Sequence, residues 1–251
     1  METISCITPT GDRPLAIFLQ CRWMKQQSVQ PTQWIIVDDG IAPSCGAGNY
    51  LIPSYAQYIR REPKADDPKH TLGANVRESL PRITGSKILI IEDDEYYAPT
   101  YIEEMSKRLN EHELVGIGRS RYYNLPHSRY FRDTNFWHAS LAQTAFRSSF
   151  LEKIKHLFDD EIYIDVRIWE TENNSRFNFS GKERKTDKGN GIIFDDGEDN
   201  PLYVGIKGLP GRPGMGIGHT HCQSFAYDEG RNQLKKWIPD NYESYLGFIG
   251  K

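Results

Sequence analysis

The first half of the chain alternates short apolar runs with longer amphipathic segments. The apolar runs are typical of buried strands and lie at residues 4–8, 33–40, 55–60, 88–91 and 113–120. Amphipathic spacing predicts helices between them, at residues 14–27, 70–83 and 99–110. Because strands and helices alternate, the sequence predicts an α/β fold in which helices cover both faces of a parallel sheet.

Two of the apolar runs end in consecutive acids, which are Asp38 and Asp39 in one run and Glu92, Asp93 and Asp94 in the other. Ligands bind beyond the carboxyl ends of the strands in an open α/β sheet, so we expect all five acids in one crevice. Neighbouring carboxylates raise one another's proton affinity and persist best beside a cation. Mg²⁺ or Mn²⁺, shared with the phosphates of a substrate, would suit them. An acidic turn before a helix that begins near Pro99 is the alternative.

The second half of the chain is less regular. Residues 136–154 predict a short strand or turn and then a helix that begins near Ser148. Asp165 follows an apolar triplet and could open a helix at residues 166–171, where a single acid often serves only as a cap. The polar residues 173–200 predict a mobile loop or a hairpin. Within residues 224–251 we expect a helix that packs across the sheet.

Residues 204–222 are rich in glycine and end in His219 and His221. Glycine at this density lets the backbone wrap around phosphates, and Lys207 or Arg212 would add positive charge. The segment contains neither a Walker motif nor a dinucleotide-binding GxGxxG after a strand. A phosphate-binding loop of another kind is therefore the expectation here.

Residues 119–132 combine four arginines with aromatic side chains and contain no acid. Such a stretch could bind phosphate or stack on bases, but a solvated surface hairpin would have a similar composition. The formal net charge of the chain is −3, which does not mark a nucleic-acid-binding protein.

Length and composition predict one large domain within 251 residues. The four cysteines are scattered without metal-binding spacing, which favours reduced thiols in a cytosolic protein. No secretion signal is evident, and no apolar run approaches the roughly 18 residues that a membrane span needs. We therefore expect a soluble cytoplasmic protein that needs neither a membrane nor an obligate protein partner.

The order of these segments resembles the GT-A-fold glycosyltransferases, especially the family-2-like group of inverting enzymes. The matching segments are the first strand with its TPT loop, IIVDDG, LGAN, ILIIEDD, HASLAQTAFRSSFLEKI, the acid Asp165 and the late His219. The resemblance implies a Rossmann-like, mostly parallel central sheet flanked by helices, with a smaller mixed sheet on the acceptor side. It also implies a single domain in which residues 1–118 bind a nucleotide sugar, while residues 119–251 bind the acceptor and complete a metal site.

The same resemblance implies roles for individual residues. Asp38 and Asp39 would hold the base and ribose of the donor, Glu92 and Asp93 would lie near the ribose and diphosphate, and Asp94 would bind Mn²⁺ or Mg²⁺. The second metal ligand would be His219, with His221 as the alternative. The other donor-binding residues would be Thr8, Pro9, Thr10, Arg13, Asn75 and Lys207.

Asp165 would be the general base that takes the proton of the acceptor hydroxyl in a single displacement with inversion. Related enzymes usually have a Glu-Asp pair at this position, whereas this chain has Ile164 and Asp165. If this segment aligns with the related enzymes a few residues earlier, Asp160 or Glu161 would be the base.

The stretch PTGDRPLAIFLQCRWMKQQ, which leads into WIIVDDG, resembles small glycosyltransferases encoded by bacteriophages. This resemblance implies transfer from a UDP-sugar to hydroxymethylated pyrimidine in duplex DNA, in the cytoplasm of the host. A surface polysaccharide or lipopolysaccharide is the alternative acceptor. A nucleotidyltransferase or a non-catalytic sugar-nucleotide binding module stays open as well, but a binding module has no need of Asp165. A nucleotidyltransferase would normally carry a basic glycine-rich loop after the first strand.

Overall fold

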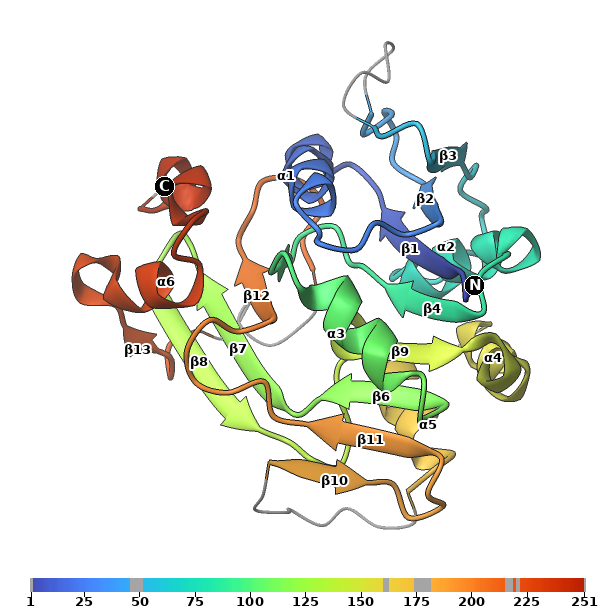
Figure 1. Ribbon diagram of the computed structural model, residues 1–251. Coiled ribbons are helices and arrows are strands. Elements are labelled where there is room, and N and C mark those ends of the chain that lie inside the picture. The colour runs from blue at the N-terminus through green and yellow to red at the C-terminus, as the bar shows by residue number, and fades with distance from the viewer. Residues whose placement is uncertain are drawn as a thin grey trace.

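The alternating segments of the sequence form two β-sheets with helices packed around them (Figure 1). The computed structural model describes residues 2–45, 52–159, 163–173, 182–214, 219 and 222–250. Within these residues, the central sheet has eight strands and the smaller sheet has five. The predicted α/β class is confirmed, with a mostly parallel central sheet flanked by helices and a smaller mixed sheet.

The central sheet has the strand order β10-β11-β6-β9-β4-β1-β2-β3. In chain order its strands are β1 (Ile4–Thr10), β2 (Gln33–Asp38), β3 (Ala56–Arg60), β4 (Lys87–Ile90), β6 (Leu114–Ile117), β9 (Thr144–Arg147), β10 (Glu183–Lys185) and β11 (Gly191–Phe194). Neighbouring strands are parallel except where β9 meets β4 and β6 and where β10 meets β11.

Strand β9 changes the parallel order that the first half of the sequence predicts, because it lies between β4 and β6 and runs against both. Its Ala145 packs into the apolar cluster on one face of the sheet, and Phe146 packs into the cluster on the other face. A strand that is buried on both faces is well suited to the middle of a sheet. The short strand predicted before Ser148 is therefore a central element.

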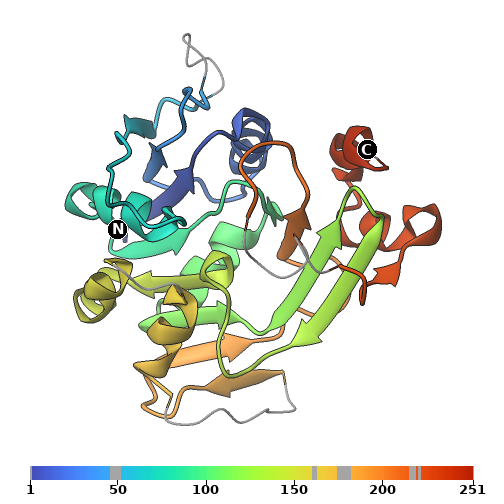
Figure 2. The same cartoon turned by 180° about the vertical axis from the view of Figure 1, so that it is seen from behind.

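Helices cover both faces of the central sheet, as the two views in Figures 1 and 2 show. They are α1 (Pro14–Lys25), α2 (Leu72–Ser79), α3 (Tyr101–Arg108), α4 (Ser148–Ile154) and α5 (Ile164–Glu170), while α6 (Asn232–Trp237) lies on the smaller sheet. Helices α1 and α3 pack against Leu89 on one face, while α2, α4 and α5 pack against Ile88 and Ile90 on the other. In the part of the chain that the structure describes, no helix has the length and apolar character needed to cross a bilayer.

The smaller sheet has the order β13-β8-β7-β12-β5 and contains both parallel and antiparallel pairs. Its strands are β5 (Tyr96–Tyr97), β7 (Arg119–Asn124), β8 (Arg129–Thr134), β12 (Tyr203–Lys207) and β13 (Ala226–Tyr227). Leu234 and Trp237 of α6 pack against this sheet together with Trp23 of α1. The C-terminal helix therefore covers the smaller sheet, not the central sheet.

The polar segment that we interpret as a loop or hairpin contains β10 and β11, which pair antiparallel. Strand β11 also pairs with β6, so the hairpin extends the central sheet at its edge. All four residues of β11 are buried, although polar residues surround them in the sequence. Residues 174–181 of this segment lie outside the described residues.

A buried ion pair joins the smaller sheet to the segment after β11. Arg121 Nη1 lies 2.8 Å from Asp196 Oδ1, and the side chains are 1% and 0% exposed. Arg121 Nη2 also donates to the carbonyl oxygen of Gly197, and Asp196 Oδ2 accepts from Leu202 N at 2.9 Å. The pair therefore fixes the path of the chain between β11 and β12.

We expect Asp196→Ala to lower the free energy of unfolding by about 3–5 kcal/mol, because it leaves the buried Arg121 guanidinium without a counter-charge. Urea denaturation would measure the change. The double variant Arg121→Met/Asp196→Leu should lose much less, and Asp199→Ala, which removes an exposed acid, is the matched control. A single-variant loss under about 1 kcal/mol, typical of a surface pair, would contradict this assignment.

Candidate active site at the carboxyl edge of the central sheet

The carboxyl ends of β1, β2 and β4 meet at one edge of the central sheet. Thr10 at the end of β1 is in register with Asp38 at the end of β2, and β1 pairs with β4 on its other side. The acidic residues 92–95 follow β4 almost directly. Parallel strands place their carboxyl ends at one edge, so the acids predicted to share a crevice lie around a common region.

Arg13, in the loop before α1, bridges two of these acids. Its Nη1 lies 2.8 Å from Asp93 Oδ1 and 2.8 Å from Asp94 Oδ2. Asp93 Oδ2 accepts a hydrogen bond of 2.5 Å from the hydroxyl of Thr10. Thr10, Arg13, Asp93 and Asp94 were all predicted site residues, and the structure brings them together.

Glu95 belongs to the same cluster, although the sequence interpretation stopped at Asp94. Its carboxylate accepts from Lys207 Nζ at 2.6 Å and from the backbone N–H of Ile206 at 2.6 Å. The predicted donor-binding Lys207 is buried at the end of β12, so it joins the smaller sheet to the acidic turn. The acidic run continues without a gap from Asp94 to Glu95, and this continuity is the signal that could have identified the fourth acid.

The electrostatics of the cluster follow from its burial. Burial, with the neighbouring Glu95 and Asp94, raises the pKa of Glu92 to about 8. Burial opposes ionisation of Asp94, but Arg13, Lys207 and His219 outweigh it and lower the pKa of Asp94. Burial and the charge of Lys207 lower the pKa of His219 to about 4. At neutral pH the site therefore contains an ionised Asp94 beside a neutral imidazole.

These side chains fit a hard divalent cation. Glu92, Asp94 and Glu95 each offer a carboxylate oxygen, and the three oxygens lie within 4.8 Å of one another. His219 Nε2 lies 3.8 Å from Asp94 Oδ2. Carboxylate oxygens suit Mg²⁺ and Mn²⁺, and a neutral imidazole favours Mn²⁺. The alternative ligand His221 lies outside the described residues.

Asp38 and Asp39 have different surroundings although they are adjacent in the sequence. The Asp38 carboxylate accepts from the backbone N–H groups of Gly40 at 2.8 Å and Ser44 at 2.6 Å. It also accepts from the Tyr58 hydroxyl and lies 3.1 Å from Arg60 Nη1. With these partners Asp38 fixes the loop after β2, and its donor-binding role stays a prediction.

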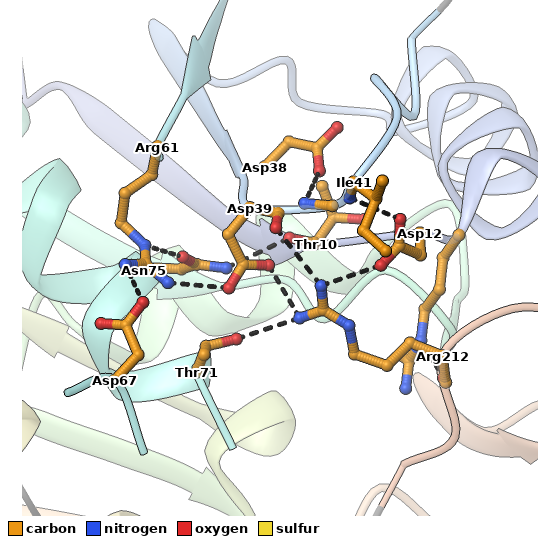
Figure 3. A network of polar contacts seen from close by, with 12 residues as sticks. Thr10, Asp12, Asp38, Asp39, Ile41, Arg61, Asp67, Thr71, Asn75 and Arg212 are labelled. Carbon is orange, nitrogen blue, oxygen red and sulfur yellow. Dashed lines mark hydrogen bonds and ion pairs between the residues drawn. The ribbon is translucent and has the colours of Figure 1, made fainter. Parts of the chain in front are cut away.

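Asp39 belongs to the polar network shown in Figure 3. Its Oδ2 accepts from Arg61 Nη2 at 2.7 Å, and its Oδ1 accepts from Arg212 Nη1 at 2.8 Å. Asn75 in α2 accepts from Arg61 Nε at 2.6 Å and donates to the Thr10 carbonyl at 3.1 Å. Asn75 therefore ties α2 to the end of β1, beside the predicted donor site.

Thr8 and Pro9, also predicted to bind the donor, lie inside β1. The Thr8 hydroxyl accepts a hydrogen bond of 2.9 Å from Trp34 Nε1, and both groups are buried. Pro9 is in register with Val37 of β2. These contacts serve the packing of β1 against β2, and a donor-binding role of either residue stays a prediction.

Asp165 lies in the first turn of α5, where Tyr163 occupies the N-cap position without a side-chain capping bond. Within the residues that the structure describes, Asp165 has no hydrogen-bonding or ion-pair partner, so the cap interpretation gains no support. Gly73 in the first turn of α2 fits closely against the start of α5, because a Cβ atom there would lie 3.1 Å from Ile164 Cδ1. Asp160 and Glu161, the alternative bases, lie outside the described residues.

Three of the four arginines of residues 119–132 have polar partners within the protein, while Arg132 is exposed. Arg119 pairs with Asp195 through contacts of 2.7 and 2.5 Å, and Arg121 pairs with Asp196. Arg129 donates to the carbonyl oxygen of Phe225 at 2.7 Å. The segment forms the β7–β8 hairpin, but β7 is partly or fully buried and not a solvated surface strand. Phosphate binding by this segment stays a prediction.

Comparison with models of known protein families finds no match, and comparison with curated proteins finds none either. Solved structures do match the fold. S. aureus TarS residues 1–349 match with a TM-score of 0.51 and 14% identity over 81% of this chain and 60% of that chain. A longer TarS structure gives 0.50 and 13%, over 81% of this chain and 36% of that chain.

A complex of TarS 1–349 with UDP-GlcNAc matches over 97% of this chain and 70% of that chain, with a TM-score of 0.50 and 12% identity. These likenesses, at 12–14% identity, show that this chain shares the fold of the matched structures. It spans 36% and 60% of the lengths of the first two TarS chains.

Proposed function

We propose that this protein is a metal-dependent, inverting glycosyltransferase that moves a sugar from a nucleotide-sugar donor to an acceptor hydroxyl. A UDP-sugar is the donor that we favour. The observation that carries the proposal is the acidic turn after β4, where Asp94 lies between Arg13 and His219. Thr10 at the end of β1 links this turn to α2, because its hydroxyl donates to Asp93 and its carbonyl oxygen accepts from Asn75. A glycosyltransferase-like fold and the UDP-GlcNAc complex of a protein with that fold support the same activity.

Asp94 and His219 would hold the cation, with Glu92 and Glu95 close to it. A divalent ion, when bound, neutralises the charge that develops on the leaving diphosphate. Arg13 stands beside the same carboxylates and offers guanidinium N–H donors to the phosphate oxygens. Lys207 compensates Glu95 and keeps this buried turn from accumulating negative charge.

Asp165 would act as the general base. The acceptor oxygen attacks the anomeric carbon, the bond from that carbon to the diphosphate oxygen breaks, and the acceptor proton passes to the Asp165 carboxylate. Attack from the face opposite the diphosphate inverts the anomeric configuration. Its neighbour Ile164 packs against the first turn of α2, and Asn75 of that helix reaches the end of β1, which supports this role.

A saccharide hydroxyl is the acceptor that we favour. The contacts of Arg119, Arg121 and Arg129 leave the hairpin with few cations for phosphate groups. The formal net charge of −3 also opposes association with DNA. Hydroxymethylated pyrimidine in phage DNA, which the sequence resemblance implies, stays as the second acceptor hypothesis.

We expect no measurable binding of the protein to a short hydroxymethylated DNA duplex, even at about 50 mM salt, because Arg119 and Arg121 are paired with acids and Arg129 with backbone carbonyl oxygens. Fluorescence anisotropy of a labelled duplex across a salt series would measure it. Binding that falls about a thousandfold between about 50 and 200 mM salt would indicate several phosphate contacts. That result would replace the saccharide proposal with the DNA acceptor.

The proposed activity can be tested by incubating the protein with a panel of nucleotide sugars, Mn²⁺ and candidate acceptors. Mass spectrometry should detect an acceptor that has gained one sugar residue, with release of the nucleoside diphosphate. Oligosaccharides and hydroxymethylated DNA belong in the same panel. Transfer of a nucleotidyl group to a sugar phosphate, in place of a sugar, would contradict the proposal.

A further inference from the structure

The guanidinium group of Arg212 lies against the carboxylate of Asp39, as Figure 3 shows. Arg212 Nη1 donates to Asp39 Oδ1 at 2.8 Å and to the Thr71 hydroxyl at 3.1 Å. Its Nη2 donates to Asp12 Oδ2 at 3.1 Å and to the Asp39 carbonyl at 3.3 Å. One side chain therefore fills the region between the ends of β1, β2 and the start of α2.

The loop that carries Arg212 packs directly on the segment after β1. Arg212 N donates to the Asp12 carbonyl at 3.3 Å, and Arg13 Nε donates to the Arg212 carbonyl at 2.7 Å. Gly211 has a φ of +124°, which a side chain would strain, and a Cβ atom there would lie 2.9 Å from Arg13 Cγ. At Gly11 a Cβ atom would lie 2.7 and 2.8 Å from the Nη2 and Cζ atoms of Arg212. No room for a ligand is left above Gly11 while Arg212 stays in place.

The burial and pairing of the Asp39 carboxylate limit which ligand groups could replace Arg212. The carboxylate is 1% exposed, and one of its oxygens is paired with Arg61 while the other is paired with Arg212. A buried carboxylate that lost Arg212 without another donor would be strongly destabilised. A ligand that enters this end of the site must therefore present its own N–H group to Asp39 Oδ1. The N3–H of uracil provides such a donor, whereas cytosine presents a lone pair at the same ring position.

We propose that Arg212 is a displaceable occupant of the base-binding end of the donor site. This inference rests on the proposed function. In the free protein Arg212 supplies the N–H donor that the nucleobase supplies in the complex, and donor binding exchanges the two at Asp39. We call the arrangement in which Arg212 contacts Asp39 the closed state. Only molecules in which Arg212 has left Asp39 bind the donor, so the apparent affinity equals the intrinsic affinity multiplied by the fraction of such molecules. Arg212 thereby sets how strongly a base must bind, and the exchange favours bases with an N–H at that position.

The exchange is tested by calorimetric titration of uridine, which carries no phosphate charge, into the wild-type protein and Arg212→Ala. We expect Arg212→Ala to bind uridine about tenfold more tightly, which corresponds to a closed state populated about ten to one. Cytidine should show no such gain. Arg82→Ala, which removes an exposed arginine paired with Glu78, is the matched control and should leave uridine binding unchanged.

A second variant keeps the test independent of the folding of Arg212→Ala. Asp12→Asn weakens one contact of Arg212 and leaves Asp39 intact, so it should raise uridine affinity in the same direction by a smaller factor. Suppose that uridine binding is unchanged or weaker in these variants while the wild type still binds UDP in the presence of Mn²⁺. That result would overturn the inference about Arg212 and leave the proposed function standing. If the wild-type protein binds no UDP with Mn²⁺ present, the proposed function fails as well.

Discussion

Asp94→Asn should lower kcat/KM for sugar transfer by at least about a hundredfold, because it removes the ionised oxygen that would bind the cation. Asp94 Oδ2 lies 2.8 Å from Arg13 Nη1 and 3.8 Å from His219 Nε2. Its pKa is lowered despite its burial, chiefly by Arg13 and then by Lys207 and His219, so the wild-type group is charged at neutral pH. Asparagine keeps the shape of the side chain but loses this charge.

The measurement is kcat/KM for a UDP-sugar over a series of Mn²⁺ concentrations. Glu111→Gln changes an exposed acid after α3 and is the control for loss of one carboxylate. Far-UV circular dichroism should match the wild type in both variants. Transfer that persists in Asp94→Asn with EDTA present would remove Asp94 from the metal site.

Asp165→Asn should slow the transfer step by about a hundredfold to ten-thousandfold while UDP binding changes by no more than about twofold. The reason is that the amide cannot take the proton of the acceptor hydroxyl. Asp165 lies in the first turn of α5 and has no ion-pair partner among the described residues, so its replacement should disturb few packing contacts.

Single-turnover transfer and UDP titration, measured on the same preparation, separate the two effects. Asp159→Asn is the matched control, because Asp159 is a nearby, half-exposed acid that pairs with Arg77. If Asp165→Asn instead loses UDP binding or folded structure, Asp165 supports the fold and another group takes the proton.

The sequence predicted the fold and the site best where a buried strand leads directly into charged side chains. Strands β1, β2 and β4 are buried along their whole lengths, and β2 and β4 carry unbroken apolar runs that lead into acids. For this reason the pattern predicted both the sheet and the edge at which its acids meet. Strand β9 has only four residues, and its antiparallel place between β4 and β6 depends on pairing with both neighbours. No local pattern encodes that pairing.

Contacts between distant segments explain what the sequence left open in the site. Asp38 and Asp39 are equivalent in the sequence, yet Tyr58 and Ser44 satisfy the former while Arg61 and Arg212 hold the latter. Arg212 is 173 positions from Asp39. The arginine-rich hairpin is a similar case, because its counter-charges Asp195 and Asp196 come from the segment after β11. The sequence shows that charged residues occur after β2 and in the hairpin. Which residues pair with them depends on the fold.

The most direct test of the account is calorimetric titration of UDP into the wild-type protein and Asp94→Asn, each with Mn²⁺ and with EDTA. We predict one UDP bound per wild-type chain with Mn²⁺, and a large loss of affinity on adding EDTA or replacing Asp94. Equal UDP affinity in all four titrations would contradict the metal site after β4. No binding in any of them would contradict a nucleotide-sugar donor altogether.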